Sequence, residues 1–356
     1  MDLAALRAHF PVLERVAYLN AGTDGPVPRA AVEAAAAELE RELIDGRVGA
    51  HFERRFALQD ELRAGYAALV GAEPDDVALT TSTSEGMGLL LAGLDLGPGD
   101  EIVTSDQEHP GLLGPLAAAR HRGVAVRMAP LATLHEAVGS ATTLVACSHV
   151  GWISGELAPS GLGELDIPVL LDGAQGAGAV PVDVAALGCA AYAAAGQKWL
   201  CGADGTGFLY VEPEFGERVR AIAPSYMSLQ DASQGIDAAL WPGARRHDTP
   251  ALAAEVVAFS CASLGVLGSV GWPDVLERAA GQARALADRL SSAGRTVAPR
   301  GDTTLVAWEE GDPPSMRDAL ASVDVVVRSL PGYPLVRASV GAWVTDEDLD
   351  RLIAAL

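Results

Sequence analysis

Short apolar runs alternate with helical stretches through the first two thirds of the chain. Nearly continuous apolar strands separated by helices are typical of a mostly parallel sheet with helices on both faces. The pattern therefore predicts an α/β fold around a seven-stranded sheet. The strand-like runs are Val77–Thr81, Ile102–Ser105, Val124–Met128, Leu144–Cys147, Val169–Leu171, Ala190–Ala194 and Phe208–Val211.

Longer helical periods flank these runs on both sides. Helices are expected over residues 27–45 and 52–69, and after Trp241–Pro250 over residues 251–267, 272–292 and 345–356. Strand-like runs at residues 304–308, 325–329 and 335–338 complete a smaller α+β unit. We predict a large domain over residues 16–245 and a small domain over residues 246–356, to which residues 1–15 also belong.

Charge and cysteine usage narrow the class of protein. The net charge of −22 argues against nucleic acid and anionic membranes as partners, because both bind basic surfaces. The four cysteines show neither metal-ligand nor disulfide spacing, which predicts packed thiols and no metal site. The start MDLAALRAHF lacks the features of an export signal, and no apolar run reaches a membrane span. We therefore expect a cytoplasmic protein.

One primary amine stands out, because Lys198 is the only lysine among 25 basic residues and the others are all arginine. A guanidinium stays protonated, whereas a desolvated lysine loses its proton and can condense with an aldehyde. The lone lysine therefore suggests Schiff-base chemistry. The alternative is that Lys198 is an ordinary surface cation.

Polar residues follow the predicted strands at the ends where ligands bind to open parallel sheets. These residues are predicted to converge on one edge. They are Ser82, Thr83, Ser84 and Glu85, then His109, then Ser148 and His149, then Asp172 and Gln175, and finally Lys198.

Each of these groups also has a structural interpretation. The stretch Ser82–Gly86 can bind phosphate at a helix N-terminus or simply cap the helix. Asp172 can cap the next helix or keep a pyridine nitrogen protonated. His109 can begin a helix, or else stack on a flat ring or shuttle protons. Arg337 can be a half-buried surface residue or a bidentate clamp on a carboxylate.

The ordered set of motifs resembles a known family. GQKWLCGADGTGFLYV, with LLDGAQ upstream and TSTSEG, SDQEHPG and SHVGWISGELAP before it, is similar to the class V aminotransferase superfamily of fold type I pyridoxal phosphate (PLP) enzymes. The branch resembled holds cysteine desulfurases, cysteine/cystine lyases and isopenicillin N epimerase-like proteins. The resemblance runs from about Tyr18 to the C-terminus.

The resemblance implies a role for individual residues. Lys198 would form the Schiff base with PLP, Asp172 would pair with the pyridine nitrogen, Gln175 would approach the phenolic oxygen, and His109 would stack on the ring. Arg337 would take the substrate α-carboxylate, with Asn20 and Ala21 nearby. Thr83, Ser84, Glu85 and Gln197 would contribute to the cofactor site. Thr249 would reach the phosphate of a partner subunit, which implies a homodimer with a shared active site.

Two departures from the family pattern matter. The triplet before the lysine is Ala195-Gly196-Gln197 where much of the family has a Ser-Gly-His type, so Arg245 or Arg246 is expected to compensate at the phosphate. The loop before Arg337 reads RSLPGYPLVR, and no cysteine follows Cys261. Cysteine desulfurase activity, which needs a cysteine on that loop, is therefore disfavoured.

The function expected from the resemblance is a PLP enzyme acting on a small amino acid. The favoured reaction is carbon–sulfur cleavage of cysteine, cystine or a cysteine S-conjugate or sulfoxide, giving pyruvate and ammonia. An isopenicillin N epimerase-like reaction and transamination are the enzymatic alternatives, and a PLP-fold binding subunit is the non-enzymatic one. Specificity is expected to reside in loops around Trp152, Tyr226 and Tyr333.

Overall fold

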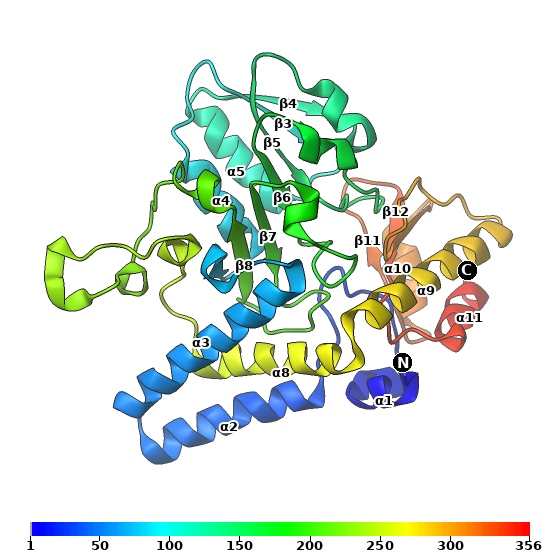
Figure 1. The fold of residues 1–356 in the computed structure, drawn as a ribbon. Helices are drawn as coiled ribbons and strands as arrows, with labels where there is room; N and C mark the ends of the chain where they lie inside the picture. Colours follow the sequence, from blue (N-terminus) through cyan, green and yellow to red (C-terminus); the bar gives the residue numbers. More distant parts are fainter. Residues whose placement is uncertain (1) are drawn as a thin grey trace.

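The computed structural model describes residues 2–356, and its centre is a seven-stranded sheet between two layers of helices (Figure 1). The strand order is β2-β8-β7-β6-β5-β3-β4, and only the two pairings made by β8 are antiparallel. This confirms the predicted fold class. The strands are β2 (Val77–Thr80), β3 (Glu101–Ser105), β4 (Ala125–Ala129), β5 (Thr142–Ser148), β6 (Val169–Asp172), β7 (Ala191–Ala195) and β8 (Gly207–Val211).

Alternate residues of each strand face opposite helical layers, as the two-residue period requires. Ile102 and Leu144 pack with α4 (Thr83–Gly93) and α5 (Pro110–His121). Their neighbours Val103 and Val145 belong to the core formed with α3 (Gly49–Val70) and α8 (Ala254–Val270). Because both faces are covered, the side chains free to meet a ligand are those beyond the strand ends.

The two ends of the chain share one hydrophobic core. Leu6 and Phe10 are buried with Trp343 and Leu349, so α1 (Leu3–Ala8) lies beside the C-terminal region. A three-stranded antiparallel sheet of order β11-β12-β9 forms the centre of this region. The strands are β9 (Leu305–Glu309), β11 (Arg328–Ser329) and β12 (Leu335–Ser339), and the helices around them are α9 (Trp272–Ser292), α10 (Pro313–Ala321) and α11 (Asp346–Ala354). The domain boundaries themselves stay a prediction.

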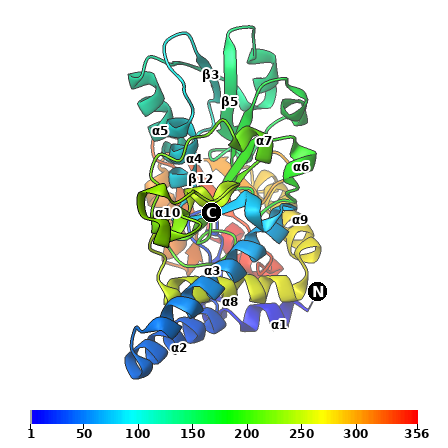
Figure 2. The ribbon, with the colours of Figure 1, turned by 60° about the vertical axis from the view of Figure 1, so that its left-hand side comes forward.

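The strand-like run predicted at residues 325–329 is extended, but it is divided into two strands that belong to two sheets. β10 (Val325–Val326) pairs with β1 (Ala17–Tyr18), whereas β11 pairs with β12. The side chains of Thr345 and Asp348 form a capping box at the start of α11. Helix α2 (Arg29–Asp45) lies along α8, as two views show (Figures 1 and 2).

The remaining short elements connect these layers. They are α6 (Val184–Leu187), α7 (Pro213–Gly216) and the 3-10 helices η1 (Pro11–Glu14), η2 (Pro74–Asp76), η3 (Leu131–Ala137), η4 (Ser160–Glu164), η5 (Tyr226–Ser228), η6 (Ala232–Asp237) and η7 (Ala244–His247). The segment carrying η5 and η6 projects away from the sheet (Figure 1), and Ile236 on it is 99% exposed. Within residues 2–356, no single helix has the length and apolar character to cross a membrane; α8 and α9 meet that test only jointly, across an 81° bend.

Candidate active site

Asp172 and Lys198 lie at the ends of neighbouring strands. Asp172 is the last residue of β6, where it pairs in register with Ser148 of β5 and Ala193 of β7. Lys198 follows β7 by three residues. The Asp172 carboxylate is 4% exposed, and its Oδ1 accepts the N–H of Ala174 at 2.9 Å. The turn-capping contact considered for Asp172 is therefore present, and it leaves the second carboxylate oxygen for another partner.

The two groups shift each other's pKa. Burial lowers the pKa of Lys198 to about 8, although Asp172 opposes the shift. Burial raises the pKa of Asp172, and the charge of Lys198 partly offsets this. A lysine with a pKa near 8 has a substantial neutral fraction at physiological pH, which is the form that reacts as a nucleophile or base. This environment contradicts the alternative of an ordinary surface cation.

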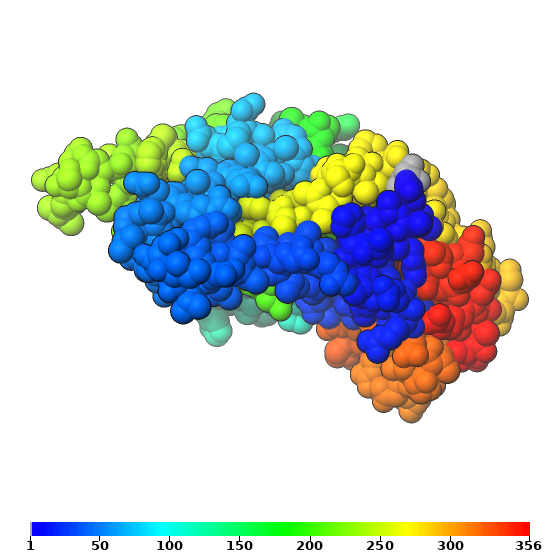
Figure 3. Space-filling view, turned by 90° about the horizontal axis from the view of Figure 1, so that it is seen from below, coloured from blue at the N-terminus to red at the C-terminus, as the bar shows by residue number. Residues whose placement is uncertain are grey.

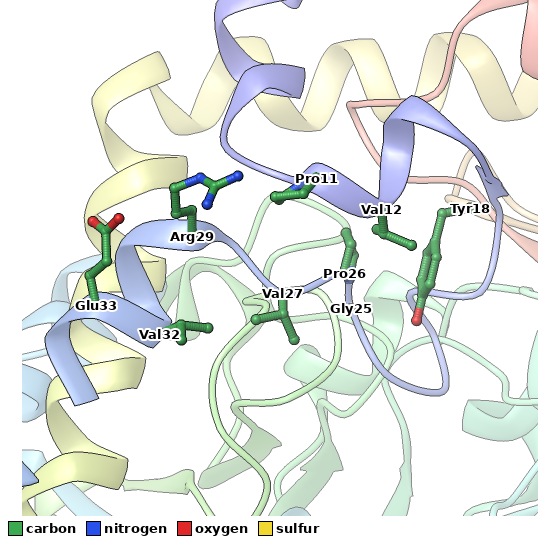
Figure 4. Close-up of a pocket in the computed structure, with 9 residues that line it drawn as sticks. All are labelled: Pro11, Val12, Tyr18, Gly25, Pro26, Val27, Arg29, Val32 and Glu33. Atoms are coloured by element: carbon green, nitrogen blue, oxygen red, sulfur yellow. The ribbon is translucent and has the colours of Figure 1, made fainter. Parts of the chain in front are cut away.

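A loop from the N-terminus, residues 19–28, closes against the lysine. The N–H of Gly25 bonds to the carbonyl of Gln197 at 2.8 Å. A Cβ at position 25 would lie only 2.3 Å from the Lys198 carbonyl oxygen, so glycine is required there. A groove of about 480 Å³ lies on the outer side of this loop (Figure 4), lined by Tyr18 and Val27 among others. It holds none of the strand-end residues and is separate from the candidate site.

His109 is both a helix cap and a neighbour of Lys198. It is the N-cap of α5, where its Nδ1 accepts the N–H of Gly111 at 3.0 Å. Burial, with Lys198 and Arg328 adding to the effect, lowers the pKa of His109 to about 4. The imidazole is therefore neutral and carries its proton on Nε2. Its ring contacts Trp152 edge-on, with centroids 5.1 Å apart; stacking on a cofactor ring stays a prediction.

Arg337 is fully buried, so the half-buried alternative is wrong. Its Nη1 donates to the carbonyl of Trp152, while Nε and Nη2 have no hydrogen-bond partner among the described residues. Ser339 Oγ also lacks one. A Cβ on Gly22 would lie 3.2 Å from Arg337 Nη2 and 2.7 Å from Ser339 Oγ, so these donors meet at Gly22. Unpaired buried donors are costly, and an anion placed there would satisfy them.

A second cation, Arg328, was not found by motif reasoning. It lies opposite Arg337 in the register of β11 and β12, and it lowers the pKa of both Arg337 and His109. Its Nη1 donates to Thr23 Oγ1 at 3.1 Å, and Thr23 donates to Asn20 Oδ1 at 2.8 Å. Hairpin register in the RSLPGYPLVR segment was the available signal. Asn20 thus holds Thr23, and the Ala21 side chain lies in the hydrophobic core.

Gln175 connects the strand ends to the loop over residues 19–28. Its Nε2 donates to the Gly22 carbonyl at 2.8 Å, and its Oε1 accepts from Trp199 Nε1 at 3.0 Å. An amide nitrogen carries two protons, so one remains for another acceptor. The predicted contact with a phenolic oxygen stays a prediction.

The helix starts of α4 and α5 meet, as a phosphate site requires. Thr83 Oγ1 is buried without a partner within residues 2–356, and so is Gln197 Oε1. A Cβ on Gly111 would lie 2.4 Å from Ser84 Oγ, which places this hydroxyl at the start of α5. Two helix N-termini and free hydroxyls suit a phosphate dianion.

Part of that stretch does act as a cap, and one residue has a different role from the one expected. Ser82 Oγ accepts the N–H of Glu85 at 3.1 Å, and the Glu85 carboxylate bonds back to Thr81. The Glu85 N–H is therefore already used inside the protein. This local cap leaves Thr83 and Ser84 as the residues of the stretch with groups available to a phosphate.

Arg245, Arg246 and Thr249 are the remaining residues expected to serve a phosphate. Arg245 stacks over the Trp241 ring at 4.8 Å, and Arg246 donates to the carbonyl of Gly216. Each guanidinium also keeps a buried Nε without a hydrogen-bond partner among residues 2–356, so the expected compensation at the phosphate stays a prediction. Thr249 bonds through its N–H to Leu79 on the edge strand β2, rather than to the strands carrying Asp172, Lys198 or Arg337.

The three aromatic residues expected to govern specificity are divided between two places. Trp152 contacts the rings of His109 and Tyr333, so both lie at the candidate site. Tyr226 instead donates to the carbonyl of Pro250 and accepts from Arg55, beside Thr249.

The residues present fit PLP in three respects: a reactive amine, a buried carboxylate at the neighbouring strand end, and unpartnered hydroxyls at two helix starts. An isopenicillin N epimerase of Streptomyces clavuligerus is 28% identical over 388 residues, covering 96% of this chain and 94% of that protein. A probable cysteine desulfurase of Pseudomonas aeruginosa is 27% identical over 410 residues, covering 98% and 96%.

A solved structure of the cystine C-S lyase C-DES with its product cysteine persulfide superimposes with a TM-score of 0.91 at 24% identity, covering 97% of this chain and 98% of that one. This likeness bears on the fold. The family model for class-V aminotransferases matches residues 17–352. With a match of that extent, the chain belongs to the class-V aminotransferase family, and its cofactor is pyridoxal 5'-phosphate.

Proposed function

We propose that the protein is a PLP-dependent carbon–sulfur lyase that cleaves a cysteine derivative by β-elimination. The observation that carries the proposal is the composition of the loop before Arg337. In this family a desulfurase receives sulfur on a cysteine of that loop, whereas residues 328–337 hold two arginines and no cysteine. When an enzyme without that cysteine cleaves the carbon–sulfur bond, sulfur departs with the leaving group instead of passing to the protein.

Bound PLP supplies an aldehyde that condenses with amines and a ring that withdraws electrons from the substrate α-carbon. The protein's own groups do the rest. Arg337 offers its Nε and Nη2 donors to the α-carboxylate and so fixes the α-carbon. Lys198 Nζ, whose pKa of about 8 gives it a larger neutral fraction at physiological pH than an ordinary lysine has, removes the α-proton. Asp172 holds a proton on the ring nitrogen, where its buried negative charge is most effective.

The leaving group departs near His109 and Trp152. Because Nδ1 of His109 accepts the Gly111 N–H, Nε2 is the only nitrogen of this ring that can exchange a proton with a ligand. The buried ring of Trp152, which contacts both His109 and Tyr333, limits the access of water at this position.

A substrate with two carboxylates fits the charge of the site better than one with a single carboxylate. Arg328 and Arg337 lie on paired strands, and each adds positive potential at His109. Cystine carries a second carboxylate, and its cleavage with one water gives pyruvate, ammonia and cysteine persulfide. The name of the structural neighbour C-DES, a cystine C-S lyase, supports the same substrate.

Pyruvate release is the direct test. PLP-loaded protein should form pyruvate from L-cystine, and Lys198→Ala should not. Arg328→Gln should raise KM for cystine about tenfold while leaving KM for S-methylcysteine almost unchanged, because only cystine has the second carboxylate. Equal effects on both substrates would remove the argument for cystine while leaving the lyase intact.

The epimerase alternative rests on the isopenicillin N epimerase of Streptomyces clavuligerus, which matches over 96% of this chain. It predicts no pyruvate but exchange of the α-proton with deuterium from solvent, at a rate that depends on Lys198. Transamination would instead require a keto acid for turnover.

We also propose a homodimer in which Thr249 serves the phosphate of the other subunit. Apolar side chains on the outer faces of α2 and α3 support it: Val32 is 52% exposed, Leu43 84% and Phe52 47%. These helices form much of the face seen in Figure 3. Light scattering at micromolar concentration should give twice the chain mass, and a monomer that retains PLP would argue against the shared site.

A further inference from the structure

Glu108 is a buried carboxyl group that the proposed reaction does not use. It lies just after β3 and is 4% exposed. Its oxygens accept the N–H of Ser148 at 2.9 and 3.0 Å, the Ser148 hydroxyl at 2.6 Å, and the Ser105 hydroxyl. The group therefore joins the ends of β3 and β5, directly before His109 in the chain.

This cluster lies beside the carboxylate expected to hold the cofactor ring. Ser148, which donates twice to Glu108, is the register partner of Asp172 on β6. The charge of Asp172 acts on Glu108, and both act on the buried thiol of Cys147. Lys198 acts on Asp172 from the end of β7, and His109, on the same loop as Glu108, is neutral. Glu108 and Asp172 are thus two buried acidic groups in one row along the strand ends, joined through Ser148.

The surroundings of Glu108 have opposing effects on its ionisation. Its partners are all donors, which favours the carboxylate. Burial and the neighbouring Asp172 oppose ionisation and raise the pKa of Glu108 to about 7. A small change in nearby charge therefore changes its protonation.

We propose that Glu108 is a positioning residue that acts through Asp172, so that binding of the cofactor ring is coupled to loss of a proton from the Glu108 cluster. The physical basis is Coulombic. A protonated ring nitrogen held by Asp172 brings a positive charge into the row, which stabilises an ionised Glu108. By linkage, an ionised Glu108 strengthens binding of the protonated ring. This rests on the PLP assignment and holds whichever reaction the loaded enzyme performs.

The sign of the pH dependence follows. Below pH 7 Glu108 is neutral before the ring binds. It must then lose a proton before its negative charge can strengthen binding of the protonated ring. Above pH 7 it is already ionised and contributes fully. Affinity for the ring should therefore rise with pH through about 7, by an amount that Glu108→Gln removes.

The test uses 4'-deoxypyridoxine 5'-phosphate, which has the ring and phosphate but no aldehyde and so cannot condense with Lys198. Its Kd for PLP-free protein is measured by fluorescence at about pH 6 and about pH 8.5. We expect Glu108→Gln to weaken binding about tenfold at the higher pH and less than twofold at the lower. Comparing the two proteins at one pH cancels the titration of Lys198 and of the probe's phosphate.

Glutamine should fit the cluster, because the Ser105 and Ser148 hydroxyls can rotate to accept from its amide. Ser105→Ala is the matched control. Ser105→Ala removes a hydrogen bond that lowers the pKa of Glu108, but it keeps the Glu108 carboxyl group. The rise of probe affinity with pH should therefore persist in Ser105→Ala, with its midpoint at a higher pH. Calorimetry near pH 7 in two buffers should show fewer protons released on probe binding by Glu108→Gln than by wild type, because Lys198 and the probe's phosphate contribute equally to both proteins.

A structural role alone predicts a different result. Glu108→Gln and Ser105→Ala would then weaken probe binding by factors that do not vary with pH, and proton release would be unchanged. Either that pattern, or wild-type affinity of Glu108→Gln at both pH values, overturns the proposal.

Discussion

Arg63 and Arg337 are both buried arginines, at 2% and 0% exposure, yet their surroundings are opposite. Arg63 donates to both carboxylate oxygens of Asp248, at 3.0 and 2.8 Å, and to the Val77 carbonyl. Arg337 has one carbonyl partner and another arginine, Arg328, as its charged neighbour. Burial therefore does not by itself identify a functional cation in this protein. The missing counter-ion is what distinguishes Arg337 from Arg63 and makes it the candidate for binding an anion.

The largest expected effect is on folding, through Arg63. Arg63→Gln leaves Asp248 buried without its ion-pair partner, and we expect the free energy of unfolding to fall by about 3–5 kcal/mol. Urea unfolding followed by circular dichroism measures this. A loss below about 1 kcal/mol would mean that the pair contributes no more than a surface pair, and the contrast with Arg337 would fail.

The next effect is on substrate. Arg337→Gln removes the charge expected to hold the α-carboxylate, so kcat/KM should fall about 100-fold, equivalent to about 2.7 kcal/mol. The visible spectrum of the PLP-loaded protein should not change, because the guanidinium is assigned to substrate rather than cofactor. Loss of that spectrum would instead make Arg337 part of the cofactor site.

The same substitution should stabilise the cofactor-free protein. Burial lowers the pKa of Arg337 to about 9 in the folded chain, so the unfolded chain binds more protons between pH 9 and its ordinary pKa. The buried charge of Arg337 therefore lowers the free energy of unfolding. This loss of stability is fully present below pH 9 and declines above it. At about pH 7.5 we expect Arg337→Gln to unfold with a free energy about 1–2 kcal/mol higher than wild type. A destabilised Arg337→Gln would show that the unpaired arginine still contributes net stability.

The smallest expected effect concerns Lys198. Its folded pKa of about 8 is also lowered, so its charge destabilises the cofactor-free protein below pH 8, and this cost is lost between pH 8 and about 10.5. Lys198→Met should therefore raise the free energy of unfolding by about 1 kcal/mol at about pH 7 and by less at pH 9. An equal gain at both pH values would point to packing by methionine instead of removal of charge.

Much of the fold could be predicted because its signals are local. Apolar runs located all seven strands of the large sheet, and helical periodicity gave α9 its observed bounds, Trp272–Ser292. Residues 325–329 were predicted as one strand because each residue is compatible with extended backbone. The pairing of β10 with β1 depends on a partner more than a hundred residues away, which no local pattern encodes, whereas the hairpin between β11 and β12 was a local signal.

The residues of the site could be predicted where their type is unusual for the chain or for their position in it. A single lysine and a carboxylate ending an apolar strand are such features, and the structure places them at neighbouring strand ends. Gly22, Ser339, Arg328 and Glu108 are common residue types whose importance arises from contacts between distant segments. Arg245 and Arg246 were assigned by residue type alone, and the ring of Trp241 and the carbonyl of Gly216 that they contact could not be predicted from the local sequence.

The contacts of residues 19–28 have a consequence for biosynthesis. This loop meets Gln175 and Gln197 in the middle of the chain, and Asn20 pairs with Ser339 near its end. A ribosome adds about 5–20 residues per second, so a nascent chain carries the finished loop for tens of seconds before Ser339 emerges. The parallel sheet can form during translation, but the loop over residues 19–28 can make its contact with Ser339 at the candidate site only after synthesis is nearly complete. Capture of the cofactor in its final geometry is thus a late event in the life of each chain.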